Sequence, residues 1–449
     1  MPELYELSVT AAANQIKQGT ISPVELAESL LDRIISLEPQ LNAWVYLDPE
    51  AVLSDARGRE AAVKSGATLG ALHGVPIGLK DIYYTAGVPT TACSKVYAEF
   101  VPDYDATTTA LLKKAGAIIL GKAVTTEFAC MDPSPTVNPW NPSHTPGGSS
   151  SGSAVAVASR MCAAALGSQT VGSVLRPASY NGVVGLKPTF GRVSRYGVIP
   201  VSWTLDTVGW MTRTVEDAAL LLQVMAGADA NDPVSGRGPV PDYQAAVESP
   251  RAPRIGLLRD FFYEHSDAET CDHVDQIVES FRSAGAAGEE LPLPDSLATS
   301  IPDQQVIMAV EGAAFHKPMY EKESGDYQPR LRDMIRRGLD TDAVTYSQAM
   351  ERRLTFITDM EILAEKVDVL LTPSTPSAAL ADITNTGDPM FQGPWTSCGL
   401  PAISIPSGIA ASGLPLGIQM VAAPNADTKL LAAASWCESV LNLTLSPAV

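Results

Sequence analysis

Apolar side chains recur on one face of residues 22–35, which predicts an amphipathic helix. Ser22 and Glu25 have the spacing of a capping box, and Pro23 suits the first helical position. The expected buried face consists of Leu26, Leu30, Leu31, Ile34 and Ile35. Because proline disrupts a helix interior, we expect this helix to end before Pro39.

Short apolar runs bounded by turn residues predict buried strands. One of them is residues 75–80, where the single charged side chain, Lys80, comes last. Residues 107–121 predict a helix that stops at Gly116, followed by a strand over 117–120. Further strands are expected at residues 183–186, 255–258, 367–371, 402–405 and 416–421.

The alternation of strands and helices predicts an α/β protein. We expect a single large domain over residues 1–449, with a central mixed, mostly parallel twisted sheet covered by helices on both faces. The Ala-rich segment 153–166 predicts a buried helix. Residues from about 230 to 350 are the most charged and least strand-like, and we expect helices there, packed at the side, that could form a lid.

The charge balance narrows the classes of partner. The chain has 31 Lys+Arg against 50 Asp+Glu, a formal net charge of −19. Nucleic acids and anionic membranes attract clustered basic side chains, so we expect neither as a partner. The N-terminal residues lack the pattern of a signal peptide, and no apolar run reaches about 18 residues. We therefore expect a cytoplasmic protein.

The six cysteines and five histidines are scattered along the chain, with no CxxC pair and no cluster at zinc spacing. This pattern favours reduced cysteines used as small apolar packing residues. We expect no metal, no cofactor and no disulfide framework.

Two Gly/Ser-rich segments, residues 146–153 and 167–173, are the candidates for chemistry. A flexible linker has no purpose between a Pro-rich loop and a buried helix. A phosphate-binding loop would need a following Gly-Lys-Ser/Thr, which is missing. A nucleophile elbow fits Gly148-Ser149-Ser150-Ser151-Gly152 formally, but residues 138–146, which precede it, do not have the character of a strand.

The order and content of several blocks resemble the amidase signature family of serine hydrolases. The matching blocks are residues 74–81, 147–153, 172–173, 182–188, 371–373, 399–402 and 413–419. They span most of the chain, and residues 230–350 match loosely. The resemblance implies the amidase signature fold, with residues 70–230 as its catalytic core. It also implies a catalytic triad of Lys80, Ser149 and Ser173, with a cis peptide bond before Ser149.

The physical chemistry of these residue types agrees with such a triad. A serine hydroxyl is a weak nucleophile until a base takes its proton, and no histidine in the blocks has an evident orienting partner. Lys80 can be that base if burial beside the apolar strand lowers its pKa by several units. Ser149 would relay the proton between Lys80 and Ser173.

The residues before the expected nucleophile suit an oxyanion hole made by the backbone N–H groups of Thr170, Val171, Gly172 and Ser173. Here the chain departs from the commoner family pattern. Gln169 stands where many members have Asp, and Val171 where they have Gly, so we expect an ordinary φ at Val171. Leu175 stands where many members have an arginine that meets a substrate carboxylate, and Arg176 follows it.

These residues predict a hydrolase of amide-type C–N bonds that acts on a small molecule, with carbamates (urethanes) and some esters as further substrate classes. An apolar pocket is expected, lined from residues 128–135, 311–327 and 388–398. The first alternative is the glutaminase (A-type) subunit of a tRNA-dependent amidotransferase, which residues 185–197 resemble. A scaffold without activity is the second. The oligomeric state stays open.

Overall fold

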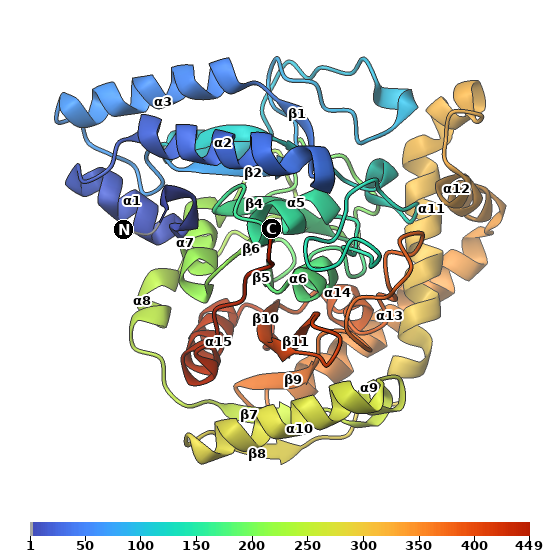
Figure 1. The fold of residues 1–449 in the computed structure, drawn as a ribbon. Coiled ribbons are helices and arrows are strands. Elements are labelled where there is room, and N and C mark those ends of the chain that lie inside the picture. The colour runs from blue at the N-terminus through green and yellow to red at the C-terminus, as the bar shows by residue number, and fades with distance from the viewer. Residues whose placement is uncertain (1–2) are drawn as a thin grey trace.

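The apolar runs of the sequence form the strands of one large sheet in the computed structural model, which describes residues 3–449 (Figure 1). A buried extended segment favours such runs because both of its faces meet other apolar side chains. The strands are Trp44–Leu47 (β1), Pro76–Lys80 (β2), Ile118–Ala123 (β3), Ala164–Gln169 (β4), Val184–Lys187 (β5), Thr207–Thr212 (β6), Arg254–Leu257 (β7), Ala287–Glu290 (β8), Val369–Pro373 (β9), Ala402–Ile409 (β10) and Pro415–Val421 (β11).

Within the described residues the sheet has 11 strands in the order β1-β3-β2-β4-β6-β5-β10-β11-β9-β7-β8. It is mixed, as expected. The expectation of a mostly parallel sheet is wrong, because only the pairs β2–β3, β2–β4, β7–β8 and β7–β9 are parallel and the others are antiparallel. Antiparallel neighbours such as β10 and β11 are joined by a short turn, so no crossover helix is needed between them.

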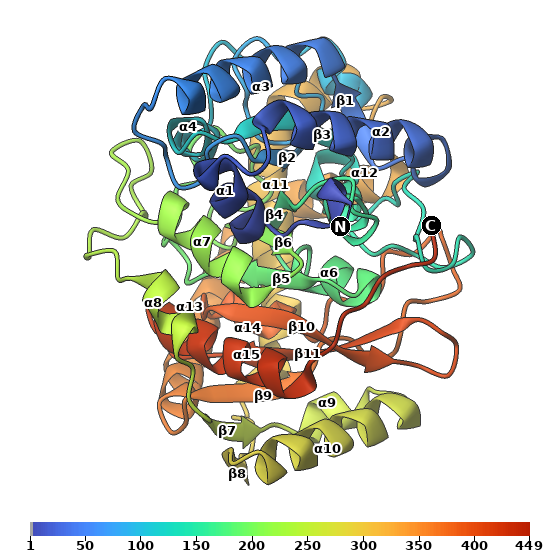
Figure 2. The same ribbon diagram turned by 60° about the vertical axis from the view of Figure 1, so that its left-hand side comes forward.

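Helices cover both faces of the sheet (Figure 1, Figure 2). Their bounds are Val9–Gln18 (α1), Pro23–Leu41 (α2), Pro49–Lys64 (α3), Thr107–Lys114 (α4), Ser151–Ala158 (α5), Leu175–Asn181 (α6), Val215–Met225 (α7), Tyr243–Glu248 (α8), Asp260–Glu264 (α9), Ala268–Ser283 (α10), Leu297–Glu323 (α11), Pro329–Asp340 (α12), Ala343–Ala364 (α13), Gly393–Ser397 (α14) and Asp427–Leu441 (α15). Helices α2 and α3 lie near one end of the sheet, and α9 and α10 near the other.

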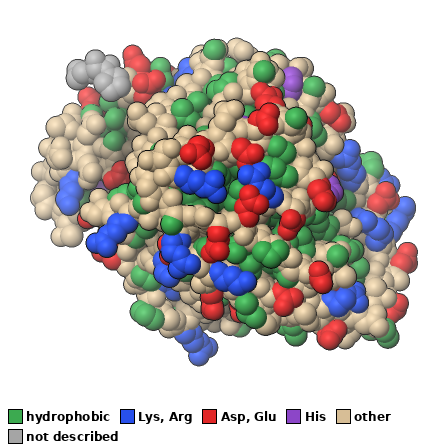
Figure 3. Space-filling model, turned by 90° about the horizontal axis from the view of Figure 1, so that it is seen from below, with side chains coloured by type: hydrophobic (Ala, Val, Ile, Leu, Met, Phe, Trp, Pro, Cys, Tyr) green, Lys and Arg blue, Asp and Glu red, His purple; other side chains and the backbone are tan. Residues whose placement is uncertain are grey.

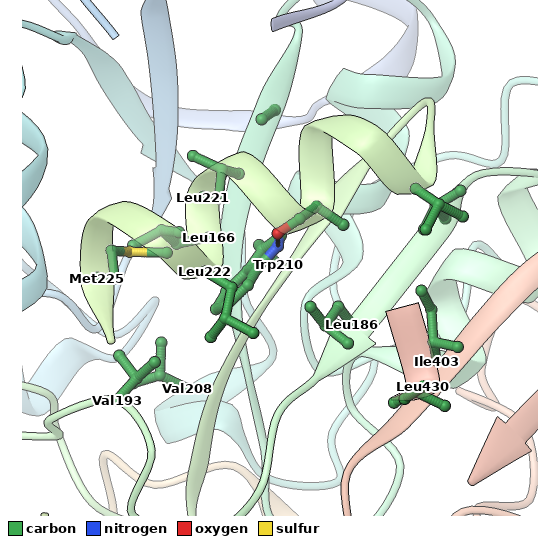
Figure 4. Close-up of a cluster of buried hydrophobic side chains, with 14 of the residues drawn as sticks. Leu166, Leu186, Val193, Val208, Trp210, Leu221, Leu222, Met225, Ile403 and Leu430 are labelled. Atoms are coloured by element: carbon green, nitrogen blue, oxygen red, sulfur yellow. Dashed lines mark hydrogen bonds between the residues drawn. The ribbon is translucent and has the colours of Figure 1, made fainter. Parts of the chain in front are cut away.

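Successive residues of the central strands point into two different cores. Leu166 and Trp210 belong to the cluster that packs on α7 (Figure 4), whereas Ala165 and Met211 belong to the cluster that packs on α5. This alternation is the period of two expected of a strand. Burial on both faces explains why β4 and β6 contain no charged residue.

Two helix predictions need correction. Helix α2 continues through Pro39 to Leu41, and Ile35, expected on the buried face, is 64% exposed. The Ala-rich segment 153–166 is not one helix: α5 ends at Ala158, and residues 164–169 form β4. Arg160 has a φ of 60°, which a right-handed helix cannot contain. A fully buried apolar run does not reveal its period, and this is why helix and strand could not be separated in the sequence.

The charged region from about 230 to 350 is mainly helical, as expected, but it also adds β7 and β8 to the edge of the sheet. Strand β8 has the sequence Ala-Gly-Glu-Glu and is exposed throughout, so no apolar pattern announces it. Helices α11, α12 and α13 stand together at the side of the molecule (Figure 1).

Among residues 3–449, no helix is both long and apolar enough to cross a membrane. Figure 3 views the molecule from below, and on that face acidic and basic side chains are interspersed rather than separated into patches of one sign.

Candidate active site

Lys80 is the last residue of β2, a strand that lies between its parallel neighbours β3 and β4. The carboxyl ends of neighbouring parallel strands meet at one edge of a sheet, and this brings Lys80 close to the end of β4. Its Nζ donates hydrogen bonds to Ser149 Oγ at 2.7 Å and to Ser168 Oγ at 2.9 Å. The structure therefore joins two of the three residues of the expected triad directly.

The environment of Lys80 favours its neutral form. The side chain is 0% exposed, and burial lowers the pKa of the amine from 10.5 to about 7. The negative charge of Asp206 opposes this decrease, and the thiols of Cys130 and Cys93 oppose it less. At neutral pH a large fraction of Lys80 is consequently uncharged and can accept a proton.

Ser149 lies in the loop that leads into α5, and the peptide bond between Gly148 and Ser149 is cis, as the resemblance implied. Gly147 has a φ of 78°, a region that favours glycine. At Gly152, a Cβ would lie 2.2 Å from the carbonyl oxygen of Ala43, so only glycine allows α5 to pack this close to the segment before β1. The glycines of the block shape the loop.

The other serines of the block hold the backbone. Ser150 Oγ accepts from the N–H of Ser168 at 3.3 Å, Ser151 Oγ donates to the carbonyl of Gly147 at 2.8 Å, and Ser153 Oγ donates to that of Leu166 at 2.8 Å. Ser150, the central residue of the formal nucleophile elbow, is fully buried, and no strand precedes it. The geometry does not fit an elbow, a linker or an exposed phosphate loop.

Ser173 lies between β4 and α6 and is partly exposed in a cavity. Its carbonyl accepts from the N–H of Ser150 at 3.4 Å, which joins its loop to that of Ser149. Hydrogen bonds from Gln304 and Thr396 side chains hold the carbonyls of Thr170 and Val171. The N–H groups of all four expected oxyanion-hole residues, Thr170, Val171, Gly172 and Ser173, donate to no acceptor within residues 3–449.

Gln169 replaces the family's usual Asp and supports the same loop. Its Oε1 accepts from the N–H groups of Val174 and Leu175 at 2.9 and 3.1 Å, and its Nε2 donates to Thr396 at 3.0 Å. It thereby satisfies N–H groups at the beginning of α6. The φ of Val171 is not positive, in agreement with the ordinary φ expected for it.

Leu175 and Arg176 lie in different surroundings. Leu175 is buried in an apolar cluster away from the cavity, while Arg176 lines the cavity. The guanidinium of Arg176 donates to the carbonyl of Gly148 at 2.6 Å and to that of Gly387 at 2.8 Å. Burial lowers its pKa to about 10. Arg176 therefore stabilises the loop just before Ser149 through these hydrogen bonds.

The cavity that contains Ser173, called the front cavity below, has a volume of about 340 Å³. Its walls come from residues 129–131, 170–173, 176, 301, 304, 305, 308, 330, 337, 385–390 and 393. Two of the three expected lining segments contribute, 128–135 and 388–398. The third, 311–327, does not: Glu311 instead accepts from the N–H of Thr204 at 3.0 Å and from Tyr346 Oη at 2.9 Å. Helix α11 meets the cavity earlier, at Met308.

Sequence reasoning missed several residues of the site. Ser168 stands beside the oxyanion block and could have been considered with it, whereas Gln304 and Thr396 come from α11 and α14, with no local signal. Within the described part of the chain, no group of three or more His, Cys, Asp or Glu side chains is placed to hold a metal ion.

Comparisons with known proteins agree with these features. The family model described as amidase matches residues 25–431. A putative amidase, AmiD, of Mycobacterium tuberculosis is 39% identical over 433 residues, which cover 93% of this chain and 90% of that protein. The A-type subunit of the glutamyl-tRNA(Gln) amidotransferase of Geotalea daltonii is 36% identical over 475 residues, 96% of each chain.

Solved structures show the same fold. The native peptide amidase from Stenotrophomonas maltophilia has a TM-score of 0.87 and 30% identity, with 99% of both chains covered. A 6-aminohexanoate cyclic dimer hydrolase has a TM-score of 0.89 and 26% identity, with 100% of this chain and 99% of that chain covered. The match over nearly the whole chain, in sequence and in fold, shows that the protein belongs to the amidase family, the amidase signature enzymes.

Proposed function

We propose that this amide hydrolase of the amidase family works through an acyl-enzyme on Ser173, with Lys80 as the base and Ser149 as the proton relay. The observation that carries the proposal is the hydrogen bond of 2.7 Å between a fully buried Lys80 and Ser149. A buried amine with a pKa near 7 can both accept and return a proton at neutral pH.

In the acylation step, Ser173 Oγ attacks the carbonyl carbon of the substrate. Its proton passes to Ser149 Oγ while the proton of Ser149 passes to Lys80 Nζ, so the relay conserves protons. The carbonyl oxygen becomes an oxyanion, which the free N–H groups of the segment from Thr170 to Ser173 stabilise. The return of the proton along the same path protonates the leaving nitrogen, and the C–N bond breaks.

In the deacylation step, water replaces the amine and attacks the acyl carbon of the ester on Ser173. The same relay removes a proton from this water and later returns one to Ser173 Oγ, which restores the starting state. The same three residues thus serve both half-reactions.

We also propose that the substrate is a small molecule with an apolar acyl or amine part. Met131, Met308 and Met390 line the front cavity, and methionine side chains adapt to apolar groups of varied shape. Three of the five N–H donors of the Arg176 guanidinium are engaged with Gly148, Gly387 and Thr386, which leaves fewer for a substrate carboxylate. Aryl or alkyl amides fit this cavity, and aryl carbamates present the same carbonyl geometry.

A second candidate function is the glutaminase component of a tRNA-dependent amidotransferase. It is favoured by the 36% identity to such a protein from Geotalea daltonii, which covers 96% of both chains. It would require partner subunits, together with a site for the charged end of glutamine. The commitment of Arg176 to backbone carbonyls and the apolar Leu175 and Val171 count against it.

The deciding experiment is a substrate screen with the purified chain alone. One acyl group is presented as an anilide, an aryl carbamate and an aryl ester, and release of the aromatic amine or phenol is followed. We expect turnover of the anilide that is lost in Ser173→Ala. Activity that appears only with glutamine and added partner subunits would establish the amidotransferase function instead. Turnover of the carbamate alone would identify a urethanase.

A further inference from the structure

A second cavity, called the rear cavity below, reaches Ser168, a hydrogen-bond partner of Lys80. Its volume is about 270 Å³. Its walls are formed by Ser168, residues 195–201, Trp203, residues 206–208, Asn231 and Asp232. None of these residues lines the front cavity. Trp203, at 48%, is among its exposed parts, so the rear cavity has its own connection to the surface.

Ser168 connects this cavity to the triad. Its Oγ accepts the second hydrogen bond of Lys80 Nζ, at 2.9 Å, in addition to the bond of 2.7 Å to Ser149. Within residues 3–449 its own hydroxyl hydrogen goes to no protein acceptor, so that hydrogen is free for water in the rear cavity. Lys80 itself has no exposed surface, and Ser168 is its hydrogen-bond partner in the wall of the rear cavity.

Asp206 connects the rear cavity to the oxyanion loop. Its carboxylate accepts from Thr170 Oγ1 at 2.6 Å and from the N–H groups of Val201 and Ser202 at 2.8 and 3.0 Å. Thr170 lines the front cavity, whereas Asp206 lines the rear one. A single carboxylate thus holds the beginning of the oxyanion loop and places a negative charge on the Ser168 side of Lys80.

We propose that Ser168 and Asp206, which share the wall of the rear cavity, are positioning residues for Lys80, and that the rear cavity is the place where this lysine exchanges its proton with solvent. The inference rests on the proposed function, because it concerns the base of that mechanism. A proton route separate from the substrate cavity lets Lys80 adjust its protonation while an acyl group or a bound substrate fills the front cavity.

The charges around Lys80 show which group has the largest influence on its pKa. Burial lowers the pKa of the amine, and the nearby Asp206 raises it. The effect of Asp206 is larger than those of Cys130 and Cys93. The neighbouring Asp81 is paired with Lys122 at 3.6 Å, so much of its charge is compensated. In the rear cavity, Asp232 is paired with Arg195 at 3.5 Å. Asp206 accepts hydrogen bonds only from uncharged donors and forms no ion pair within residues 3–449, although the nearby charge of Arg195 compensates it in part.

The pH profile of kcat/KM in the Asp206→Asn variant tests the electrostatic half of the proposal. Asparagine keeps the shape, and its oxygen can still accept from Val201 and Ser202. Loss of the negative charge makes Lys80 easier to deprotonate, so we expect the acid limb to move to lower pH by about one unit. If the substitution only disturbed the structure, kcat/KM would decrease at every pH and the acid limb would stay at the same pH. The matched control is Asp232→Asn, whose paired charge should leave the limb in place.

The outcomes separate this inference from the proposed function. An unmodified enzyme with no acid limb near neutral pH would contradict Lys80 as the base. A normal acid limb that stays in place in Asp206→Asn would overturn the role of Asp206 and leave the triad intact.

The second part of the proposal, access of solvent through the rear cavity, is tested without an activity assay. In Ser168→Cys, methanethiosulfonate ethylammonium should label the new thiol faster than in Ser153→Cys, a fully buried position outside both cavities, as measured by intact mass against the parent chain. Equal and slow labelling of both thiols would show that solvent does not reach Lys80 through the rear cavity.

Discussion

The serine loops and the outer wall of the front cavity are built in opposite ways. In residues 147–176, every polar side chain except that of Ser173 is buried, and most are bonded to backbone, as Ser151, Gln169 and Arg176 show. The outer wall, from α11 and α12, presents Met308 and the exposed arginines Arg330 and Arg337. The loops are thus rigid and the wall is adaptable.

This difference assigns catalysis to the serine loops and substrate selectivity to the outer wall. A reaction that needs donors within a few tenths of an ångström of the oxyanion requires side chains whose conformations are already fixed. Substrate choice needs only shape and polarity, which flexible side chains on surface helices can change at little cost to the fold. Substitutions in the loops should therefore reduce kcat, and substitutions in the wall should change KM and the preferred substrate.

The largest effect is expected for the nucleophile. Ser173→Ala removes the attacking oxygen, and kcat should fall by about 10⁴-fold or more while the melting temperature changes little. Steady-state kinetics on an anilide measures it. Ser150→Ala, which loses only contacts to the backbone of Ser168, should be much milder. The opposite order of the two effects would restore the nucleophile elbow.

Next in size is the loss of the base. Lys80→Met keeps the length of the side chain but cannot accept a proton, so kcat should decrease by about 10²- to 10⁴-fold. In the unmodified enzyme the amine is charged and inactive below its pKa of about 7 and neutral and active above it. The rate should consequently rise from pH 6 to pH 8. A flat profile from pH 6 to pH 10 would contradict lysine as the base.

A smaller effect is expected from the residue that supports the oxyanion loop. Gln169→Ala leaves the buried N–H groups of Val174 and Leu175 without their acceptor. We expect a loss of about 1–3 kcal/mol in the free energy of unfolding and a decrease of roughly tenfold in kcat. Urea denaturation and kinetics measure the two quantities. Unchanged kcat with reduced stability would show that Gln169 supports only α6.

The smallest effect should come from the outer wall. Met308→Ala removes apolar surface from the front cavity without touching the triad. KM for a large apolar substrate should rise several-fold while kcat stays within about twofold, because binding is lost equally in the ground and transition states. A strong decrease in kcat would contradict the separation between loops and wall. Comparing a small and a large acyl group makes the measurement sharper.

Local signals predicted much of the fold. The capping box at Ser22 and the helix–glycine–strand order of residues 107–121 are both present in the structure. The predictions failed where the pattern of apolar residues does not show what the segment packs against. The segment 153–166 is apolar throughout, so its division into α5 and β4 depends on what surrounds it, and β8 has no apolar pattern because it is an exposed edge.

The sequence by itself determined which residue types could do chemistry: a lysine at the end of an apolar strand, and serines set among glycines that permit unusual backbone geometry. Only the tertiary structure decided their relations. It joined Lys80 to Ser149 and Ser168, buried Leu175 while turning Arg176 to the cavity, and brought Gln304 and Thr396 to the oxyanion loop. The physical reason is that side-chain periodicity reports burial along one segment, whereas hydrogen bonds and pKa values depend on groups that distant segments bring together.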